Sequence, residues 1–146
     1  MALAATMIAS EVALPAPDRG SPSCFGGMRS ALVRGGFSGP LICSRGDATF
    51  SLAGQTKGHK YSIYDYRYRF LPANGNVRHG GQRIIVFRGT AYAGQYMIAT
   101  PPYTSMSVNG TRVVFQTAGA PRVQIDFSRG PPNEILVNGE VARFFR

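Results

Sequence analysis

The sequence has few of the residues that build most catalytic and metal sites. Its 146 residues include only two histidines, His59 and His79, and two cysteines, Cys24 and Cys43. It contains no HExxH, GxSxG, Walker A, EF-hand or CxxC pattern. Neither cysteine is grouped with a histidine, which argues against zinc binding and thioredoxin-like redox chemistry. We therefore predict no catalytic residues, no metal and no cofactor. An enzyme whose site is assembled from distant segments is the least favoured alternative.

Acidic residues are also scarce. The chain has 7 acidic against 16 basic residues, 14 of which are arginine, and its formal net charge is +9. An excess of this size attracts polyanions such as nucleic acid, anionic lipid or acidic glycans. Arginine in particular forms bidentate contacts with phosphate and carboxylate groups and stacks on aromatic rings. The composition alone leaves open which of these partners is bound.

No apolar run reaches the roughly 20 residues needed to cross a membrane as a helix. The N-terminus, MALAATMIASEVALPAP, resembles the apolar and cleavage regions of a secretory signal, although it has no leading basic residue and Glu11 interrupts it. We expect export, with cleavage after Ser10 or Ala16. Residues 1–23 then form a signal-like, flexible segment that precedes an all-β domain at 24–146.

The compartment decides how Cys24 and Cys43 are interpreted. In an exported chain they would form a disulfide, which would be worth about 3 kcal/mol in the chain-entropy treatment. In a cytosolic chain they would be two separate thiols. Because we expect export, we predict the disulfide.

Long amphipathic helices are missing as well, since no 3.6-residue apolar period is sustained over ten residues. The 18 glycines and 10 prolines are scattered singly along the chain, which is typical of short strands joined by tight turns. Alternating apolar and polar residues recur from residue 24 onward. This pattern predicts about eight to ten short antiparallel strands arranged as a single small barrel or sandwich.

Several segments are expected to form particular strands. Residues 29–35 and 39–45 are short strand candidates, and the β-branched run at 82–89 is typical of a strand buried on both faces. Asn-Gly pairs at 109–110 and 138–139 separate β-rich arms, which predicts two hairpins with type I′ turns.

The stretch YSIYDYRYRF at residues 61–70 alternates between two kinds of side chain. On a strand, one face would carry the aromatic residues Tyr64, Tyr66, Tyr68 and Phe70. The opposite face, which carries Arg67 and Arg69, is expected to face solvent. The aromatic face fits core packing best. The alternative is an exposed or cleft-lining face on which bases or sugars stack.

Residues 57–88 carry seven basic side chains and one acidic side chain, Asp65, and therefore +6 of the net charge. We predict that they contact a partner through Lys57, Lys60, Arg67, Arg69, Arg78, Arg83 and Arg88. The function we expect is that of a small exported, non-catalytic protein, periplasmic or secreted. It would bind an anionic envelope component or an acidic protein surface. The alternative is a cytosolic barrel that binds single-stranded nucleic acid through its tyrosine face.

Overall fold

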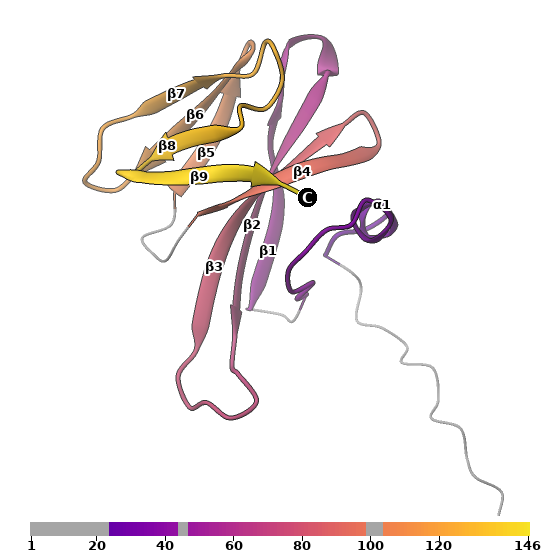
Figure 1. The fold of residues 1–146 in the computed structure, drawn as a ribbon, viewed down its shortest axis with the longest axis vertical. Helices are drawn as coiled ribbons and strands as arrows, with labels where there is room; N and C mark the ends of the chain where they lie inside the picture. Colours follow the sequence, from indigo (N-terminus) through magenta and orange to yellow (C-terminus); the bar gives the residue numbers. More distant parts are fainter. Residues whose placement is uncertain (1–23, 44–46, 99–103) are drawn as a thin grey trace, which may run out of the picture.

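Strands dominate the part of the chain that the structure describes (Figure 1). The computed structural model describes residues 24–43, 47–98 and 104–146. The helical elements are α1 (Met28–Arg34) and η1 (Lys57–His59). The strands are β1 (Ala48–Gln55), β2 (Tyr61–Phe70), β3 (His79–Arg88), β4 (Ala91–Ile98), β5 (Thr104–Asn109), β6 (Arg112–Thr117), β7 (Val123–Asp126), β8 (Glu134–Val137) and β9 (Glu140–Phe145). The predicted all-β class is confirmed.

The strands form two antiparallel sheets that pack as a sandwich. The larger sheet has the order β1-β2-β3-β4-β9-β8, and the smaller has the order β5-β6-β7. On one side the two sheets lie close together. There the backbone N–H of Lys57, which follows β1, donates to the carbonyl oxygen of Gly110, which follows β5, at 2.8 Å. On the other side β7 and β8 are not hydrogen-bonded to each other. The strands therefore do not close into a barrel, and of the two predicted arrangements the sandwich fits.

Both Asn-Gly pairs lie at hairpins, but the two turns differ. At the β8–β9 hairpin, Asn138 and Gly139 both have positive φ, 54° and 76°, as a type I′ turn requires. At the β5–β6 hairpin, Asn109 is paired with Arg112, so Gly110 and Thr111 form the turn. Of these two, only Gly110 has positive φ, at 62°, which is the requirement of a type II′ turn. The predicted type I′ turn is therefore wrong at this hairpin: the turn lies one residue later and is of type II′.

The main core lies between the two sheets. Ile63, Ile84 and Tyr96 from the larger sheet are fully buried, as are Val113 and Phe115 from the smaller one. The Tyr96 hydroxyl donates to the Pro132 carbonyl oxygen at 2.6 Å, so the buried phenol keeps a hydrogen-bond partner. Strand β3 is buried from residue 81 to 87, which confirms the prediction of a strand covered on both faces.

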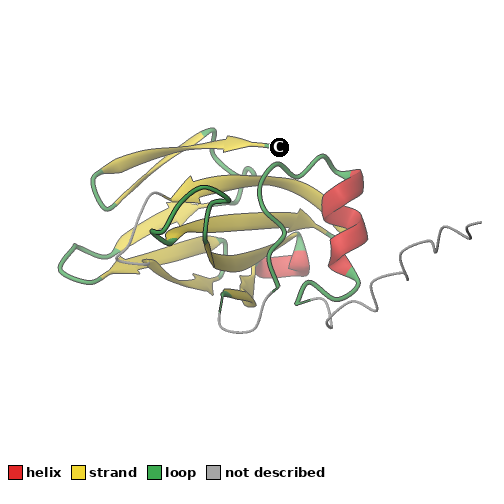
Figure 2. Ribbon diagram, turned by 90° about the horizontal axis from the view of Figure 1, so that it is seen from below, coloured by secondary structure: helices red, strands yellow, loops and turns green. Residues whose placement is uncertain are grey.

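The outer face of the larger sheet is covered by residues 24–43, which we call the N-terminal cover. It contains α1 and lies on the opposite side of the long strands from the smaller sheet (Figures 1 and 2). Phe25 and Leu32 of the cover are fully buried against Tyr66, Ile85 and Phe87. Of the aromatic face of β2, Tyr66 and Tyr68 belong to the core, as the favoured interpretation predicted, whereas Tyr64 is half-buried and Phe70 is exposed.

The cover is not built as the sequence predicted. Residues 29–35 were expected to form a strand, but residues 28–34 form α1, which buries Ala31 and Leu32. Two turns of helix are too short to show a 3.6-residue period, although Met, Ala, Leu and Arg all favour helix. The expected strand at 39–45 is also wrong where it is described, since residues 39–43 have no strand pairing. The predicted signal segment, residues 1–23, lies outside the described residues.

The charged face of β2 is only partly solvated. Asp65 and Arg67 form an ion pair at 2.9 Å, and the Arg67 side chain is 32% exposed. Arg67 also donates to the Thr104 carbonyl oxygen at 3.2 Å, and the buried Gln82 side chain bonds both Thr104 and Asp65. The expectation that Arg67 faces solvent holds only in part, because the start of the smaller sheet packs against it. Arg69 is exposed, as expected.

Candidate functional site

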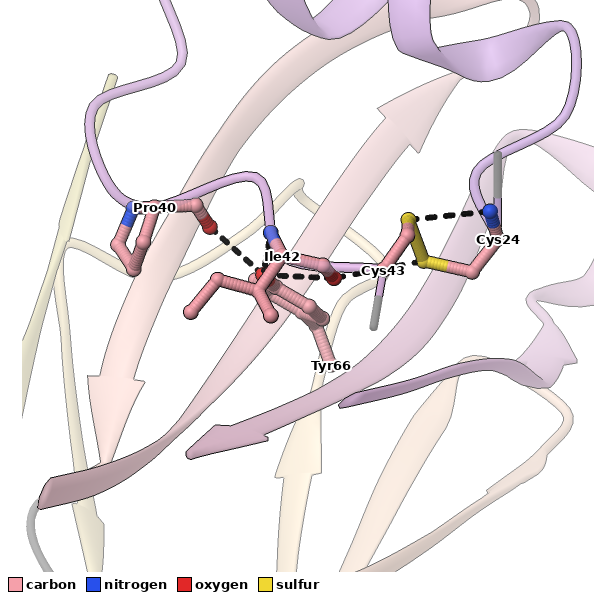
Figure 3. Close-up of a disulfide and its surroundings, with 5 residues drawn as sticks. All are labelled: Cys24, Pro40, Ile42, Cys43 and Tyr66. Carbon is pink, nitrogen blue, oxygen red and sulfur yellow. Dashed lines mark hydrogen bonds between the residues drawn. A yellow bond between two sulfur atoms is a disulfide. The ribbon is translucent and has the colours of Figure 1, made fainter. Parts of the chain in front are cut away.

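The predicted disulfide is present and fastens the two ends of the N-terminal cover (Figure 3). Cys24 and Cys43 are joined, and the backbone N–H of Cys24 also points to Cys43 Sγ at 3.0 Å. Beside the disulfide, the Tyr66 hydroxyl donates to the Pro40 carbonyl oxygen at 2.6 Å and accepts from the Ile42 N–H at 2.9 Å. A strand side chain thus satisfies backbone groups of the irregular segment at 40–42. Burial raises the pKa of the Tyr66 hydroxyl.

Arg83 holds the middle of the cover. Its side chain, only 8% exposed, donates to the Ser38 carbonyl oxygen and to Gln95 Oε1, both at 2.8 Å. It also donates to the Tyr68 hydroxyl at 3.2 Å and lies over the Phe37 ring. No carboxylate of the described residues lies within ion-pair distance. Arg83 was predicted to contact a partner, but the structure buries it as a fixed part of the fold.

A pocket opens where the cover meets the end of the larger sheet. Its volume is about 400 Å³. Helix α1 supplies one wall, strands β1 to β3 supply the floor, and the β3–β4 turn supplies the rim. Its lining includes no acidic residue and comprises Gly27, Met28, Ala31, Arg34, Gln55, Ser62, Tyr64, Phe87, Gly89 and Thr90.

The polar groups of this pocket divide into two sets. Gln55 is engaged: its Nε2 donates to the Ser62 hydroxyl at 3.0 Å, and its Oε1 lies 2.6 Å from His59 Nδ1. By contrast, the Arg34 guanidinium and the Tyr64 and Thr90 hydroxyls have no hydrogen-bond partner among the described residues. The Tyr64 ring is held by stacking on Phe50, with centroids 4.8 Å apart. Three donors therefore line the pocket without an internal acceptor.

Three of the predicted basic residues lie at this same end of the sheet. Arg88 is opposite Tyr61 in the β2–β3 register and directly precedes the lining residue Gly89. Lys60 directly precedes Tyr61, and Lys57 begins η1, which joins β1 to β2. All three are exposed, and none forms an ion pair within the described residues. We call Lys57, Lys60, Arg88 and the pocket together the basic end.

The remaining predicted residues lie elsewhere. Arg69 and Arg78 flank the loop of the β2–β3 hairpin, where Arg78 forms an ion pair with Asp47. This loop is at the far end of β2, a strand of ten residues that spans about 30 Å. The basic residues at 57–88 therefore do not form one surface: three lie at the basic end, two lie at the hairpin loop, Arg83 is buried, and Arg67 is half-buried beside Thr104.

The aromatic residues offer little stacking surface. Tyr66 is fully buried beneath the cover. Tyr68 is 6% exposed and lies beside Arg83. Phe70, at the hairpin loop, is 40% exposed and lies 5.9 Å from the His79 ring. A nucleic-acid strand could not reach the Tyr66 and Tyr68 rings without displacing the cover, so the structure gives the stacking alternative no support.

Neither histidine is joined to an acidic partner. His59 bonds Gln55, and His79 contacts Phe70; in the described part of the chain neither ring bonds a carboxylate. A search of the described residues finds no group of three or more His, Cys, Asp or Glu side chains that could hold a metal ion. The same residues include no helix with the length and apolarity to span a bilayer.

Sequence reasoning missed Arg34, Gln55, Ser62 and Thr90, all of which line the pocket. Arg34 was assigned to a strand, so nothing placed it over the sheet. Gln55 and Ser62 share a face only because they are register partners, with Ser62 in turn paired to Phe87. The one available signal was the charge excess around residues 57–60. No protein-family model, curated protein or solved structure matches this chain.

Proposed function

We propose that this protein is a small exported, non-catalytic binding protein that captures an anionic group of an envelope component at its basic end. The observation that carries the proposal is the pocket at α1. Arg34, Tyr64 and Thr90 present donors there without internal acceptors, and no acidic residue lines the site. Lys57, Lys60 and Arg88 add unpaired positive charge at the same end of the sheet.

The chemistry of the donors defines the ligand class. A phosphate, sulfate or carboxylate could accept from the guanidinium and from the hydroxyls at once, and charge-assisted hydrogen bonds of this kind are the strong ones. Lysine and arginine at the same end of the sheet would attract a polyanion to this end of the molecule. An acidic protein surface shares this chemistry and is the second source of such groups. The Cys24–Cys43 disulfide supports export, because disulfides persist in oxidising compartments.

The test compares retention on heparin and on vesicles that contain phosphatidylglycerol. The variant Lys57→Ser/Lys60→Ser/Arg88→Ser should elute at lower salt than the wild type. The matched control, Arg112→Ser/Arg122→Ser/Arg129→Ser, removes the same charge from exposed positions on β6 and on either side of β7. If the basic end binds, the control should elute close to the wild type; equal losses in both variants would mean that only net charge matters.

Two further measurements separate the pocket from its surroundings. Arg34→Gln removes the charged guanidinium of the pocket, and Tyr64→Phe removes its phenol donor while the Phe ring keeps the stacking on Phe50. We expect each to reduce affinity for heparin several-fold without shifting the unfolding midpoint. Unchanged affinity in both would place binding outside the pocket. Mass spectrometry of the native chain tests export, since a mature chain that starts after residue 10 or 16 is expected.

A further inference from the structure

Among the described residues, no hydrogen bonds join the edge strand β7 of the smaller sheet to the edge strand β8 of the larger sheet. In the described part of the chain β7 is hydrogen-bonded only to β6, and β8 only to β9. Each has four residues, and each leaves one edge of backbone N–H and carbonyl groups without a strand partner. Such edges are templates for the addition of another strand.

An apolar groove of about 500 Å³ lies between these two strands. Val123 and Ile125 of β7 and Leu136 of β8 line it. The β6–β7 turn (Gly119, Ala120, Pro121) and the β8–β9 turn (Asn138, Gly139) line the rest of it. None of these residues is charged, and the Leu136 side chain is 57% exposed. In a chain with so many arginines, an apolar opening of this kind marks a contact site.

Positive charge flanks the groove along β7. Arg122 directly precedes the strand and Arg129 follows it closely; both are exposed and neither forms an ion pair among the described residues. The Asp126 carboxylate accepts from the Ser128 N–H and hydroxyl at 2.9 and 2.8 Å, and the charge of Arg112, its register partner on β6, offsets its own. Glu134 of β8 is paired with Arg143. The uncompensated charge at the two ends of β7 is therefore positive.

From these features we infer that the groove binds an extended segment of a partner protein, which adds a strand to the free edge of β7. Alternate apolar side chains of that segment fill the groove, and an acidic residue at each end meets Arg122 and Arg129. A helix would leave the β7 edge without hydrogen bonds, whereas an extended segment satisfies it. Strand β7 has four residues, and Arg129 lies in the turn that follows it. A segment that pairs with β7 and reaches past it by one or two residues at each end would have six to eight residues. This site is separate from the basic end.

The experiment uses an array of peptides of the form Glu-X-Thr-X-Thr-X-Glu, in which X is Val, Ile, Leu or Phe. The best binders are then measured in solution by fluorescence anisotropy. We expect Leu136→Glu to weaken binding about tenfold or more. The control is Val141→Glu: Val141 is the cross-strand partner of Leu136 and is 61% exposed, but it does not line the groove. This control should bind within about twofold of the wild type.

Two further measurements identify strand addition as the mode of binding. In an added strand, only every second backbone N–H points toward β7. Of two peptides N-methylated at odd or at even positions, the one that has lost the N–H groups facing β7 should therefore not bind. In the complex, hydrogen exchange at the backbone amides of residues 123–126 should slow. The variant Lys57→Ser/Lys60→Ser/Arg88→Ser should bind the peptides as the wild type does, because the two sites are independent.

Three results would overturn the inference. The first is that no peptide of the array binds. The second is that binding is equally strong with Leu136→Glu or with both N-methylated peptides. The third is a wild-type dimer that Leu136→Glu converts to a monomer in sedimentation experiments, which would make a second copy of this chain the occupant of the groove.

Discussion

The Tyr66 hydroxyl and the Pro40 carbonyl oxygen lie 2.6 Å apart, and this hydrogen bond joins the centre of a β-strand to the irregular part of the N-terminal cover. The Tyr66 hydroxyl oxygen also accepts from the Ile42 N–H. A second buried tyrosine, Tyr92, makes no such contact, since its hydroxyl has no hydrogen-bond partner among the described residues. The nearby Gln95 side chain instead donates to Ser38 and accepts from Arg83.

These two tyrosines should respond differently to loss of the hydroxyl. We expect Tyr66→Phe to lower the free energy of unfolding by about 1–2 kcal/mol, because the Pro40 carbonyl and Ile42 N–H lose a partner in a buried site. Tyr92→Phe should leave stability unchanged or raise it slightly, since it removes a hydroxyl that is buried without a partner. Urea unfolding of both variants decides the matter; equal destabilisation would contradict the assignment.

The same burial makes the fold sensitive to alkali. Burial raises the pKa of Tyr92 to about 12, against the opposing effect of the Arg83 charge, and it also raises the pKa of Tyr66. Below about pH 10 the phenols are protonated in both the folded and unfolded states, so they do not affect stability. Above it, the unfolded chain loses protons that the folded chain retains.

The free energy of unfolding should therefore fall as pH rises from about 10 to 12, by up to roughly 1.4 kcal/mol per pH unit for each buried tyrosine. Urea unfolding at a series of pH values measures the slope, and absorbance of phenolate follows ionisation. Tyr92→Phe should reduce this slope. A slope that is the same in wild type and variant would show that Tyr92 titrates normally in the folded protein.

Period-two alternation predicted the strands well because it depends only on local geometry. YSIYDYRYRF is β2 from its first residue to its last, and the assignment of its aromatic face to the core is correct for Tyr66 and Tyr68. Alternation shows which side chains share a face, but it does not show what covers that face. The cover comes from residues 24–43, so neither the burial of Arg83 nor the pocket at Arg34 could be read from the strand pattern.

Contiguity in the sequence also misled the prediction of one basic surface. Lys57 and Arg78 are only 21 positions apart in the sequence. However, Lys57 precedes strand β2 and Arg78 follows it, so the ten extended residues of β2 separate them. The register of β2 with β3 then brings Arg88 back to the Lys60 end. Charge counts in a β protein become surfaces only after the strand pairing is known.

Arg83 and Arg88 provide a test of that distinction. We expect Arg83→Met to lower the free energy of unfolding by about 2–4 kcal/mol, because the Ser38 carbonyl and Gln95 Oε1 lose a charged donor in a buried site. Arg88→Met is the control: its side chain is exposed and unpaired within the described residues, so stability should change by no more than about 0.5 kcal/mol. Guanidinium unfolding gives both values. A loss below about 1 kcal/mol for Arg83→Met would show that the buried cation contributes no net stability.

The disulfide links the stability of the fold to the pocket. Cys24 and Cys43 are 19 residues apart, and closure of a loop of this length is worth about 3 kcal/mol in the chain-entropy treatment. Treatment with dithiothreitol, or the substitution Cys24→Ser/Cys43→Ser, should lower the free energy of unfolding by about that amount. Because α1 carries Arg34 and lies within the fastened loop, the reduced protein should also elute from heparin at the lower salt expected of Arg34→Gln. Reduction that lowers stability but leaves heparin elution unchanged would show that the larger sheet and its tyrosines, without the disulfide, suffice to hold the helix over the pocket.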